Sequence, residues 1–125
     1  MVFISFILPT DAKEKKKVKK YEAEFTGYYP DDSLMEGGYY SATGELLDPS
    51  AYTVAAPSCI PFGAKITVGG TGNKRDGWTY TVNDRGGAII VDDDGVYHID
   101  ILMRNAQQAN KFGRVKGYII VEVDD

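Results

Sequence analysis

Cysteine and histidine are scarce in this chain of 125 residues, which contains one of each, Cys59 and His98. A single cysteine cannot form a disulfide within the chain. Structural zinc sites need about four Cys, His or carboxylate ligands, and catalytic zinc sites about three. We therefore expect neither zinc nor another cofactor. A chain of this length buries roughly two-thirds of its unfolded surface, so a hydrophobic core can hold it without such aids.

Long hydrophobic runs are lacking as well. The apolar residues 2–8, interrupted by Ser5, are far fewer than the ~20 that a membrane-spanning helix requires, so we expect no membrane span. The small residues at 9–12 are similar to the cleavage region of a secretory signal, yet no basic segment precedes the run and lysines follow it. We interpret residues 1–16 as either a signal remnant or a linker, and residues 17–125 as one domain.

Basic side chains are few in the body of the chain, although the net charge is only −4. Residues 1–20 hold six of the 14 basic and two of the 18 acidic side chains, which leaves eight basic and 16 acidic side chains in residues 21–125. Nucleic-acid binding depends on a basic surface that neutralises phosphates. The acidic body therefore excludes a nucleic acid as the main partner.

Alternation of apolar and polar residues with a period of two covers most of the chain and predicts β-strands. The alternating segments are residues 17–28, 65–68, 78–83 and 98–101, followed by the β-branched run 118–123. Fourteen glycines and five prolines separate them, which is typical of a small β-barrel or sandwich. By contrast, we interpret the proline-containing residues 53–63 as a rigid connection.

Residues 105–112 have helical spacing instead. Their apolar side chains recur every third residue, Asn105 is a suitable N-cap, and Gly113 follows the last helical residue. The sequence thus predicts a mostly β domain with one short helix. Residues 31–50 are polar and rich in Tyr and Gly, and they predict a long ordered loop of the kind that often serves function.

Two aspartates occupy positions where a carboxylate can carry out acid–base chemistry. Asp100 lies between two isoleucines, so its side chain should point away from the core, on the same side of the strand as His98. Asp84 continues the apolar side of its strand and is followed by glycines, which predicts a partly buried carboxylate at a strand end. The local sequence leaves two interpretations open: a catalytic pair, or a turn-capping Asp84 and a surface Asp100.

Six short motifs add to this interpretation when they are taken together and in order. They are residues 25–29 (FTGYY), 54–57 (VAAP), 60–66 (IPFGAKI), 83–89 (NDRGGAI), 99–101 (IDI) and 109–114 (ANKFGR). The ordered set resembles the three-aspartate (3D) domain, a six-stranded double-psi β-barrel related to lytic transglycosylase A, rare lipoprotein A and the expansins. The resemblance covers residues 21–123 and implies this barrel fold with one short helix.

The resemblance also implies a function, that of a lytic transglycosylase that cleaves bacterial peptidoglycan between N-acetylmuramic acid and N-acetylglucosamine. The product would be a 1,6-anhydro sugar formed without water, so the two-carboxylate scheme of hydrolases is not required. Asp100 matches the family's catalytic acid, and Asp84 matches the partner that opposes charge on the oxocarbenium-like sugar. We expect a monomer whose partner is the glycan strand, located outside the cell or in the bacterial cell wall, or encoded by a phage.

The candidate substrate-binding residues belong to these motifs or, in the case of the histidine, share a strand side with Asp100. They are Tyr28, Tyr29, Arg85, Gly86, Gly87 and His98. The tyrosines offer aromatic faces on which sugar rings can stack, although tyrosine is also a common strand residue. The histidine either tunes Asp100 or serves as an ordinary hydrogen-bonding group. Tyr39 and Tyr40 form a second aromatic pair of this kind.

Two departures from the family pattern keep other functions open. Many 3D domains carry their first aspartate where this chain has Ala56, and residues 90–96 lengthen the interval between Asp84 and Asp100 as an inserted hairpin. We interpret the aspartates at 92–94, at the hairpin tip, as a solvated turn. The alternatives are a non-catalytic, expansin-like module that binds cell wall, and a structural component of a phage tail or cell envelope.

Overall fold

The computed structural model describes residues 16–31 and 38–124. The apolar run at residues 2–8, and with it the choice between a signal remnant and a linker, lies outside the described residues. Within these two ranges, no helix is long and apolar enough to cross a membrane.

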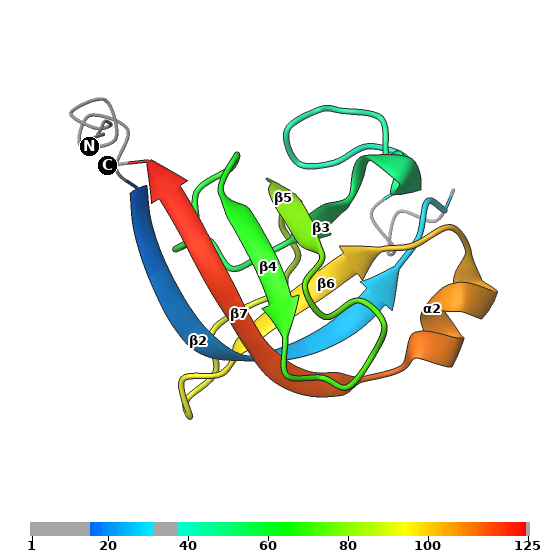
Figure 1. Ribbon diagram of the computed structural model, residues 1–125. Coiled ribbons are helices and arrows are strands. Elements are labelled where there is room, and N and C mark those ends of the chain that lie inside the picture. The colour runs from blue at the N-terminus through cyan, green and yellow to red at the C-terminus, as the bar shows by residue number, and fades with distance from the viewer. Residues whose placement is uncertain (1–15, 32–37, 125) are drawn as a thin grey trace, which may run out of the picture.

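Six strands form a closed barrel, in which β7 runs alongside β2 (Figure 1). The strands are β2 (Lys16–Tyr28), β3 (Thr53–Ala55), β4 (Lys65–Gly69), β5 (Thr79–Asp84), β6 (Tyr97–Leu102) and β7 (Val115–Asp124). Their order around the barrel is β2, β6, β3, β5, β4, β7. The prediction of a mostly β, six-stranded barrel with one short helix is confirmed.

The strand pairing has an internal symmetry. β2 and β6 run parallel, as do β3 and β5, and all other neighbours are antiparallel. If β2 is exchanged with β5, β3 with β6, and β4 with β7, parallel neighbours remain parallel and antiparallel neighbours remain antiparallel. Two parallel pairs related in this way are the topology of a double-psi β-barrel. The arrangement also places β3 between β5 and β6, the strands that carry the two aspartates.

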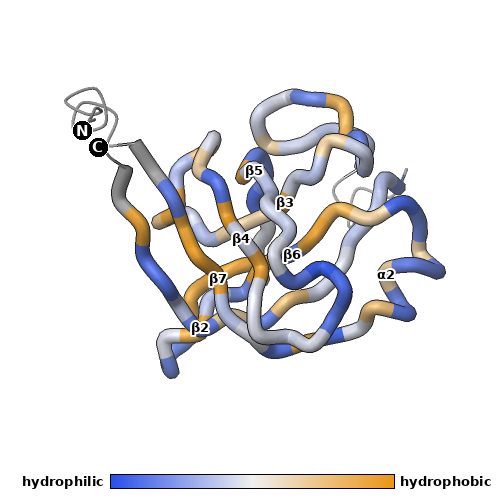
Figure 2. The backbone as a smooth tube through the Cα atoms, in the orientation of Figure 1, coloured by the Kyte–Doolittle hydropathy of each residue, from blue (hydrophilic) through white to orange (hydrophobic). Residues whose placement is uncertain are grey.

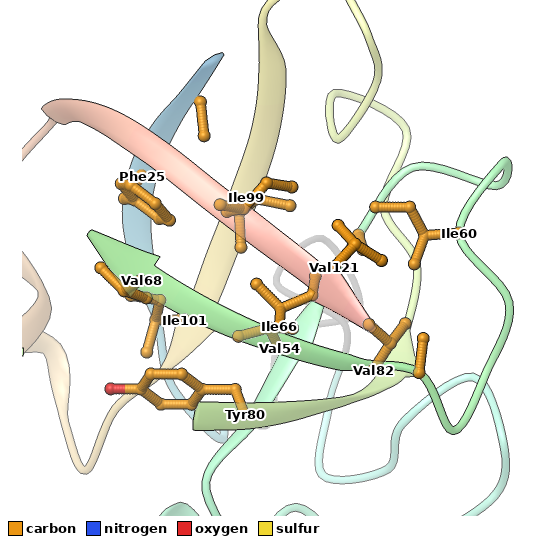
Figure 3. Packing of buried hydrophobic residues seen from close by; sticks show 14 of the residues in the cluster. Phe25, Val54, Ile60, Ile66, Val68, Tyr80, Val82, Ile99, Ile101 and Val121 are labelled. Atoms are coloured by element: carbon orange, nitrogen blue, oxygen red, sulfur yellow. The ribbon is translucent and has the colours of Figure 1, made fainter. Parts of the chain in front are cut away.

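The hydrophobic core fills the barrel interior. Phe25, Ile66, Tyr80 and Ile99 come from four different strands, are almost completely buried, and project into the same interior (Figure 3). Apolar and polar stretches alternate along the strands, as Figure 2 shows. On β6 the two isoleucines are buried, whereas His98 and Asp100 on the other side of the strand are half-buried. The predicted alternation therefore sets which side chains face the core.

The helix α2 (Ala106–Phe112) follows β6 and packs against β2. The Asn105 side chain caps its first turn by accepting a hydrogen bond from the Gln108 N–H at 2.9 Å. Gly113 ends the helix with a φ of 70°, a conformation that favours glycine. The predicted helix, its N-cap and its terminating glycine are confirmed.

The interpretation of residues 53–63 as a connection alone was wrong. Thr53–Ala55 form the strand β3, which lies in the centre of one wall of the barrel and pairs with both β5 and β6. All three residues are buried, so their side chains do not alternate between apolar and polar types. Three residues with no alternation give no period-two pattern by which a strand can be predicted.

Candidate functional site

Asp84 and Asp100 lie on β5 and β6, the two strands that flank β3, so one aspartate lies on each side of Ala55. Ala55 pairs with Asp84 on β5 and with Asp100 on β6. Because neighbouring strands lie about 4.8 Å apart, the two aspartate Cα atoms are separated by about 10 Å. A register shift between Val54 and Ala55 brings Asp84 level with its partner. The fold thus brings together two carboxylates from different strands.

The Asp84 carboxylate is held by three hydrogen bonds in a site where only 9% of the residue is exposed. The backbone N–H groups of Ala42 and Arg85 both donate to Oδ1 at 2.9 Å. The Tyr28 hydroxyl donates to Oδ2 at 2.9 Å. An ionised carboxylate only accepts hydrogen bonds, so three donors match this form. The prediction of a partly buried carboxylate at the end of this strand is confirmed.

Tyr28 links the first strand to the two aspartates. Its backbone is level with Leu102 on β6, while its hydroxyl donates to Asp84 on β5, so the side chain connects β2 with β5. Burial, and then the negative charge of Asp84, raises the pKa of this hydroxyl far above its ordinary value, and the charge of Asp100 adds to the effect. Tyr28 is therefore a neutral donor in the field of both carboxylates.

Asp100 is half-buried on the outer side of β6. Parallel pairing places it beside Thr26 of β2, whose hydroxyl donates to its Oδ1 at 3.0 Å. The sequence predicted an outward-facing side chain here, and this is confirmed. The two aspartates thus differ in surroundings, because Asp84 is almost enclosed and Asp100 lies on a more open part of the wall.

The loop before β3 covers part of this wall. Ala42 supplies one donor to Asp84, and Glu45 Oε1 accepts hydrogen bonds from Asn83 Nδ2 at 3.1 Å and from the Thr43 hydroxyl at 3.0 Å. Among the described residues, Asn83 Oδ1 is buried without a hydrogen-bond partner. The predicted ordered loop is confirmed for its described residues, and a polar acceptor lies next to Asp84 beneath it.

Arg85 is turned away from the two carboxylates. Its guanidinium donates to the carbonyl oxygens of Ile60 at 2.7 Å and Ala56 at 3.3 Å, and it lies over the Phe62 ring, 4.0 Å from the ring centroid. Gly86 and Gly87 are exposed beside Asp84, where backbone can approach a ligand. The two glycines are therefore exposed after the end of β5, and the arginine side chain holds the 56–62 connection.

His98 lies between two acidic side chains. Its Nε2 is 3.1 Å from Asp92 Oδ2, and its Nδ1 is 3.6 Å from Glu24 Oε1. Asp92 also accepts hydrogen bonds from the N–H groups of Val96 and Asp94, and the donors of Val96, His98 and Asp94 lower its pKa. A bridge between Val91 and Tyr97 closes the segment. The hairpin predicted at residues 90–96 is confirmed, and His98 at the start of β6 forms a hydrogen bond with it.

The remaining tyrosine candidates fall into two groups. Tyr29 is partly buried and packs against the hydrophobic core. Tyr39 and Tyr40 are exposed by 49% and 62%, so their rings are accessible to a ligand. The structure therefore separates Tyr28, which lies at the carboxylates, from Tyr29, although the two are adjacent in sequence.

Sequence reasoning missed several members of the site. Thr26 contacts Asp100 because β2 and β6 run parallel and in register, and its only sequence signal is its place in the motif at 25–29. Ala42 contributes a backbone N–H, which any residue other than proline offers, so no side-chain pattern could reveal it. Glu45 was not distinguished from other polar residues of the loop.

Among the described residues, no group of three or more His, Cys, Asp or Glu side chains is placed to bind a metal ion. Comparison with models of known protein families and with curated proteins gives no match to this chain.

Proposed function

We propose that the protein is a lytic transglycosylase that cleaves peptidoglycan between N-acetylmuramic acid and N-acetylglucosamine. The observation that carries this proposal is the placement of Asp84 and Asp100 on either side of Ala55, with the Tyr28 side chain in the field of both. One carboxylate is fixed by three donors and the other is half-buried on the outer barrel wall. Paired carboxyl groups with different environments are typical of acid-catalysed glycoside cleavage. Such an enzyme would act in the bacterial cell wall.

Asp100 is the general acid in this proposal. Its protonated form donates a proton to the glycosidic oxygen, and the bond between that oxygen and C1 of muramic acid breaks, with the electron pair remaining on the oxygen. The Asp100 carboxylate then takes the proton from the C6 hydroxyl of the same muramic acid, and O6 bonds to C1. The products are a free hydroxyl on N-acetylglucosamine and a 1,6-anhydro ring, and Asp100 is again protonated.

Asp84 is the electrostatic partner. Its oxygens are fixed by the donors described above, so the negative charge needs no reorganisation when positive charge develops at C1. Tyr28, which donates to Asp84 and lies near Asp100, is placed to hold the pair in register. Asp84 and Asp100 therefore have separate tasks.

Digestion of purified sacculi tests the proposal. The wild-type protein should release muropeptides that mass spectrometry identifies by their anhydro ends. Asp100→Asn removes the proton donor and should reduce release by about a hundredfold or more. Asp93→Asn changes an exposed aspartate of the hairpin tip in the same way and should leave release unchanged. Reducing ends would indicate a hydrolase, and no product at high protein concentration would contradict any enzymatic role.

A second candidate function is a non-catalytic module that binds the cell wall. Exposed aromatic rings of the loop before β3 favour it, because Tyr39, Tyr40 and Tyr52 are exposed by 49%, 62% and 50% and can stack on sugars. Ala56 also favours it, because this position is fully buried and carries no carboxylate. The binder predicts sedimentation with sacculi without released fragments, unchanged by Asp100→Asn and weakened by Tyr39→Ala combined with Tyr40→Ala.

A further inference from the structure

A cavity of about 430 Å³ lies at the end of the barrel beside α2. Three cations line it, Lys74, Arg75 and Arg104, together with the rings of Tyr52 and Trp78. Figure 2 shows that the β4–β5 loop and the turn before α2, which carry these cations, are strongly hydrophilic. We call this feature the basic cavity.

The charge of the basic cavity is opposite to that of the domain around it. Residues 21–125 contain eight basic and 16 acidic side chains, and three of those eight basic side chains meet here. The acidic residue that lines the cavity is Asp48, whose Oδ1 already accepts hydrogen bonds from the N–H and hydroxyl of Ser50. A local excess of positive charge on an acidic protein attracts an anionic ligand.

Arg75 is the buried member of this group. Only 8% of the residue is exposed, its guanidinium lies 5.0 Å from the Trp78 ring centroid, and its NH1 donates to the Tyr80 hydroxyl at 2.8 Å. Within residues 16–31 and 38–124, none of the three cations forms an ion pair with a carboxylate. A buried charge without a counter-ion is costly, so an anion in the cavity would stabilise this arrangement.

The aromatic wall of the basic cavity is fixed in place. Tyr52 has a φ of 55°, the left-handed conformation that residues other than glycine seldom adopt. In this conformation its ring meets Trp78 edge-on, with the centroids 5.7 Å apart, and meets Tyr80 in the same way at 5.9 Å. Strained backbone that orients a side chain beside a cavity is typical of binding sites.

The basic cavity is adjacent to the aspartate pair. Leu102 lines it and lies two residues after Asp100 on β6, which separates their Cα atoms by about 7 Å. Alternation along the strand puts both side chains on the same side. A ligand that has its glycosidic bond at Asp100 could therefore place a substituent in the cavity.

We propose that the basic cavity binds a carboxylate group of the peptide that branches from N-acetylmuramic acid in peptidoglycan. This inference rests on the proposed function. Such peptides end in, and carry along their length, free carboxylates, which the planar guanidinium of an arginine binds with two parallel hydrogen bonds. Arg75 and Arg104 supply guanidinium groups, Lys74 adds charge, and Trp78 gives an apolar wall for the adjoining peptide.

Calorimetric titration of the full chain with a free stem peptide tests this inference without requiring cleavage. The probe is an acetylated stem tripeptide with free carboxylates, and its fully amidated form is the reference. The combined substitutions Lys74→Gln and Arg104→Gln change two exposed side chains. They should weaken binding of the acidic peptide about fivefold to tenfold, because two partly exposed ion pairs with the peptide are lost. Lys111→Gln with Lys116→Gln removes the same charge from exposed positions outside the cavity and should leave binding unchanged.

Added salt should weaken binding of the acidic peptide to the wild-type protein, because the ion pairs are partly screened. Equal affinity for the amidated peptide, or an equal loss in the Lys111 and Lys116 variant, would overturn the assignment. Tighter binding of a glycerol phosphate oligomer than of the peptide would also overturn it, in favour of a phosphate site. Peptide binding with no release of fragments from sacculi would support the cavity while rejecting the enzymatic proposal, so the two are tested separately.

Discussion

Asp84 and Asp100 carry the same side chain, but their neighbours give them different properties. Asp84 is surrounded by donors from three segments of the chain, Tyr28, Ala42 and Arg85, and is almost enclosed. Asp100 is half-buried and accepts a hydrogen bond from Thr26 across one strand pair. The first arrangement contributes to folding as well as to any chemistry, whereas the second contributes less to stability.

Asp84→Asn should lower the stability of the protein more than Asp100→Asn does. The amide of asparagine brings an N–H₂ group toward the donors of Ala42, Arg85 or Tyr28, so at least one charge-assisted hydrogen bond is lost. We expect a loss of about 1.5–3 kcal/mol in the free energy of unfolding for Asp84→Asn. Urea denaturation of both variants measures the difference. A larger loss for Asp100→Asn would show that the roles assigned to the two aspartates are reversed.

The sequence identifies the two aspartates but few of the groups that surround them. Alternation in β6 correctly predicts that Asp100 points outward, because its isoleucine neighbours define the buried side. The Ala42 N–H and the position of Tyr28 across two strands depend on the barrel being closed. Contacts made by backbone groups, or by side chains from a distant strand, leave no pattern in the local sequence.

At the scale of secondary-structure elements, α2 and β2 approach closely at Gly27. A Cβ atom added there would lie 2.7 Å from Met103 Sδ and 3.2 Å from the Ala109 Cα. Gly27→Ala should therefore lower the free energy of unfolding by about 1–3 kcal/mol through overpacking. Gly87→Ala is the matched control, because a Cβ there meets nothing within 4 Å, and it should change stability by about 0.5 kcal/mol or less. Thermal melting of both variants, with equal effects as the contradicting outcome, tests this contact.

The hairpin at residues 90–96 should respond to acid through Asp92. Hydrogen bonds from the Val96 N–H, from His98 and from the Asp94 N–H lower the pKa of this carboxyl below its ordinary value of 3.8. A lowered pKa means that the stabilisation is present above the ordinary value and is lost as the pH falls through the lowered one. Asp92→Asn should therefore melt below wild type at neutral pH, and the difference should vanish in strong acid.

Asp93→Asn controls for the loss of one negative charge at the same hairpin tip, because Asp93 is exposed. Its melting temperature should follow that of the wild type over the whole pH range. A difference between Asp92→Asn and wild type that persists unchanged in acid would show that shape, and not charge, is what Asp92 contributes.

Sequence patterns reveal the elements of this fold unequally, for a physical reason. The long strands and the helix each bury one side. In such an element the apolar residues recur with the period of the strand or the helix, so the sequence predicts it. β3 is buried on both sides and is three residues long, so it has no period, and its sequence indicates only a connection. This hidden strand holds Ala55, the residue that both aspartates flank. The spacing of the site therefore follows from the element that is hardest to predict.

At the scale of the whole molecule, the chain closes the barrel on itself. Lys16 at the start of β2 pairs with Asp124 at the end of β7, so the two ends of the described barrel lie side by side (Figure 1). β2 is held from both sides, by β7 and by β6, which begins some 70 residues later in the chain. Stability therefore depends on contacts between distant segments more than on where the chain starts.

A circular permutant of the barrel tests this conclusion. Joining Asp124 to Lys16 needs only a short flexible linker, because paired antiparallel strands hold these Cα atoms about 5 Å apart. New ends between Asp93 and Asp94 fall at an exposed hairpin tip, where cleavage breaks no strand, so the permutant should fold with the wild-type circular dichroism spectrum and a melting temperature reduced by only several degrees. New ends after Val54 should prevent folding, since they interrupt the buried strand β3, which pairs with both β5 and β6. If the two permutants proved equally stable, β3 could not be the element that holds the two carboxylates in place.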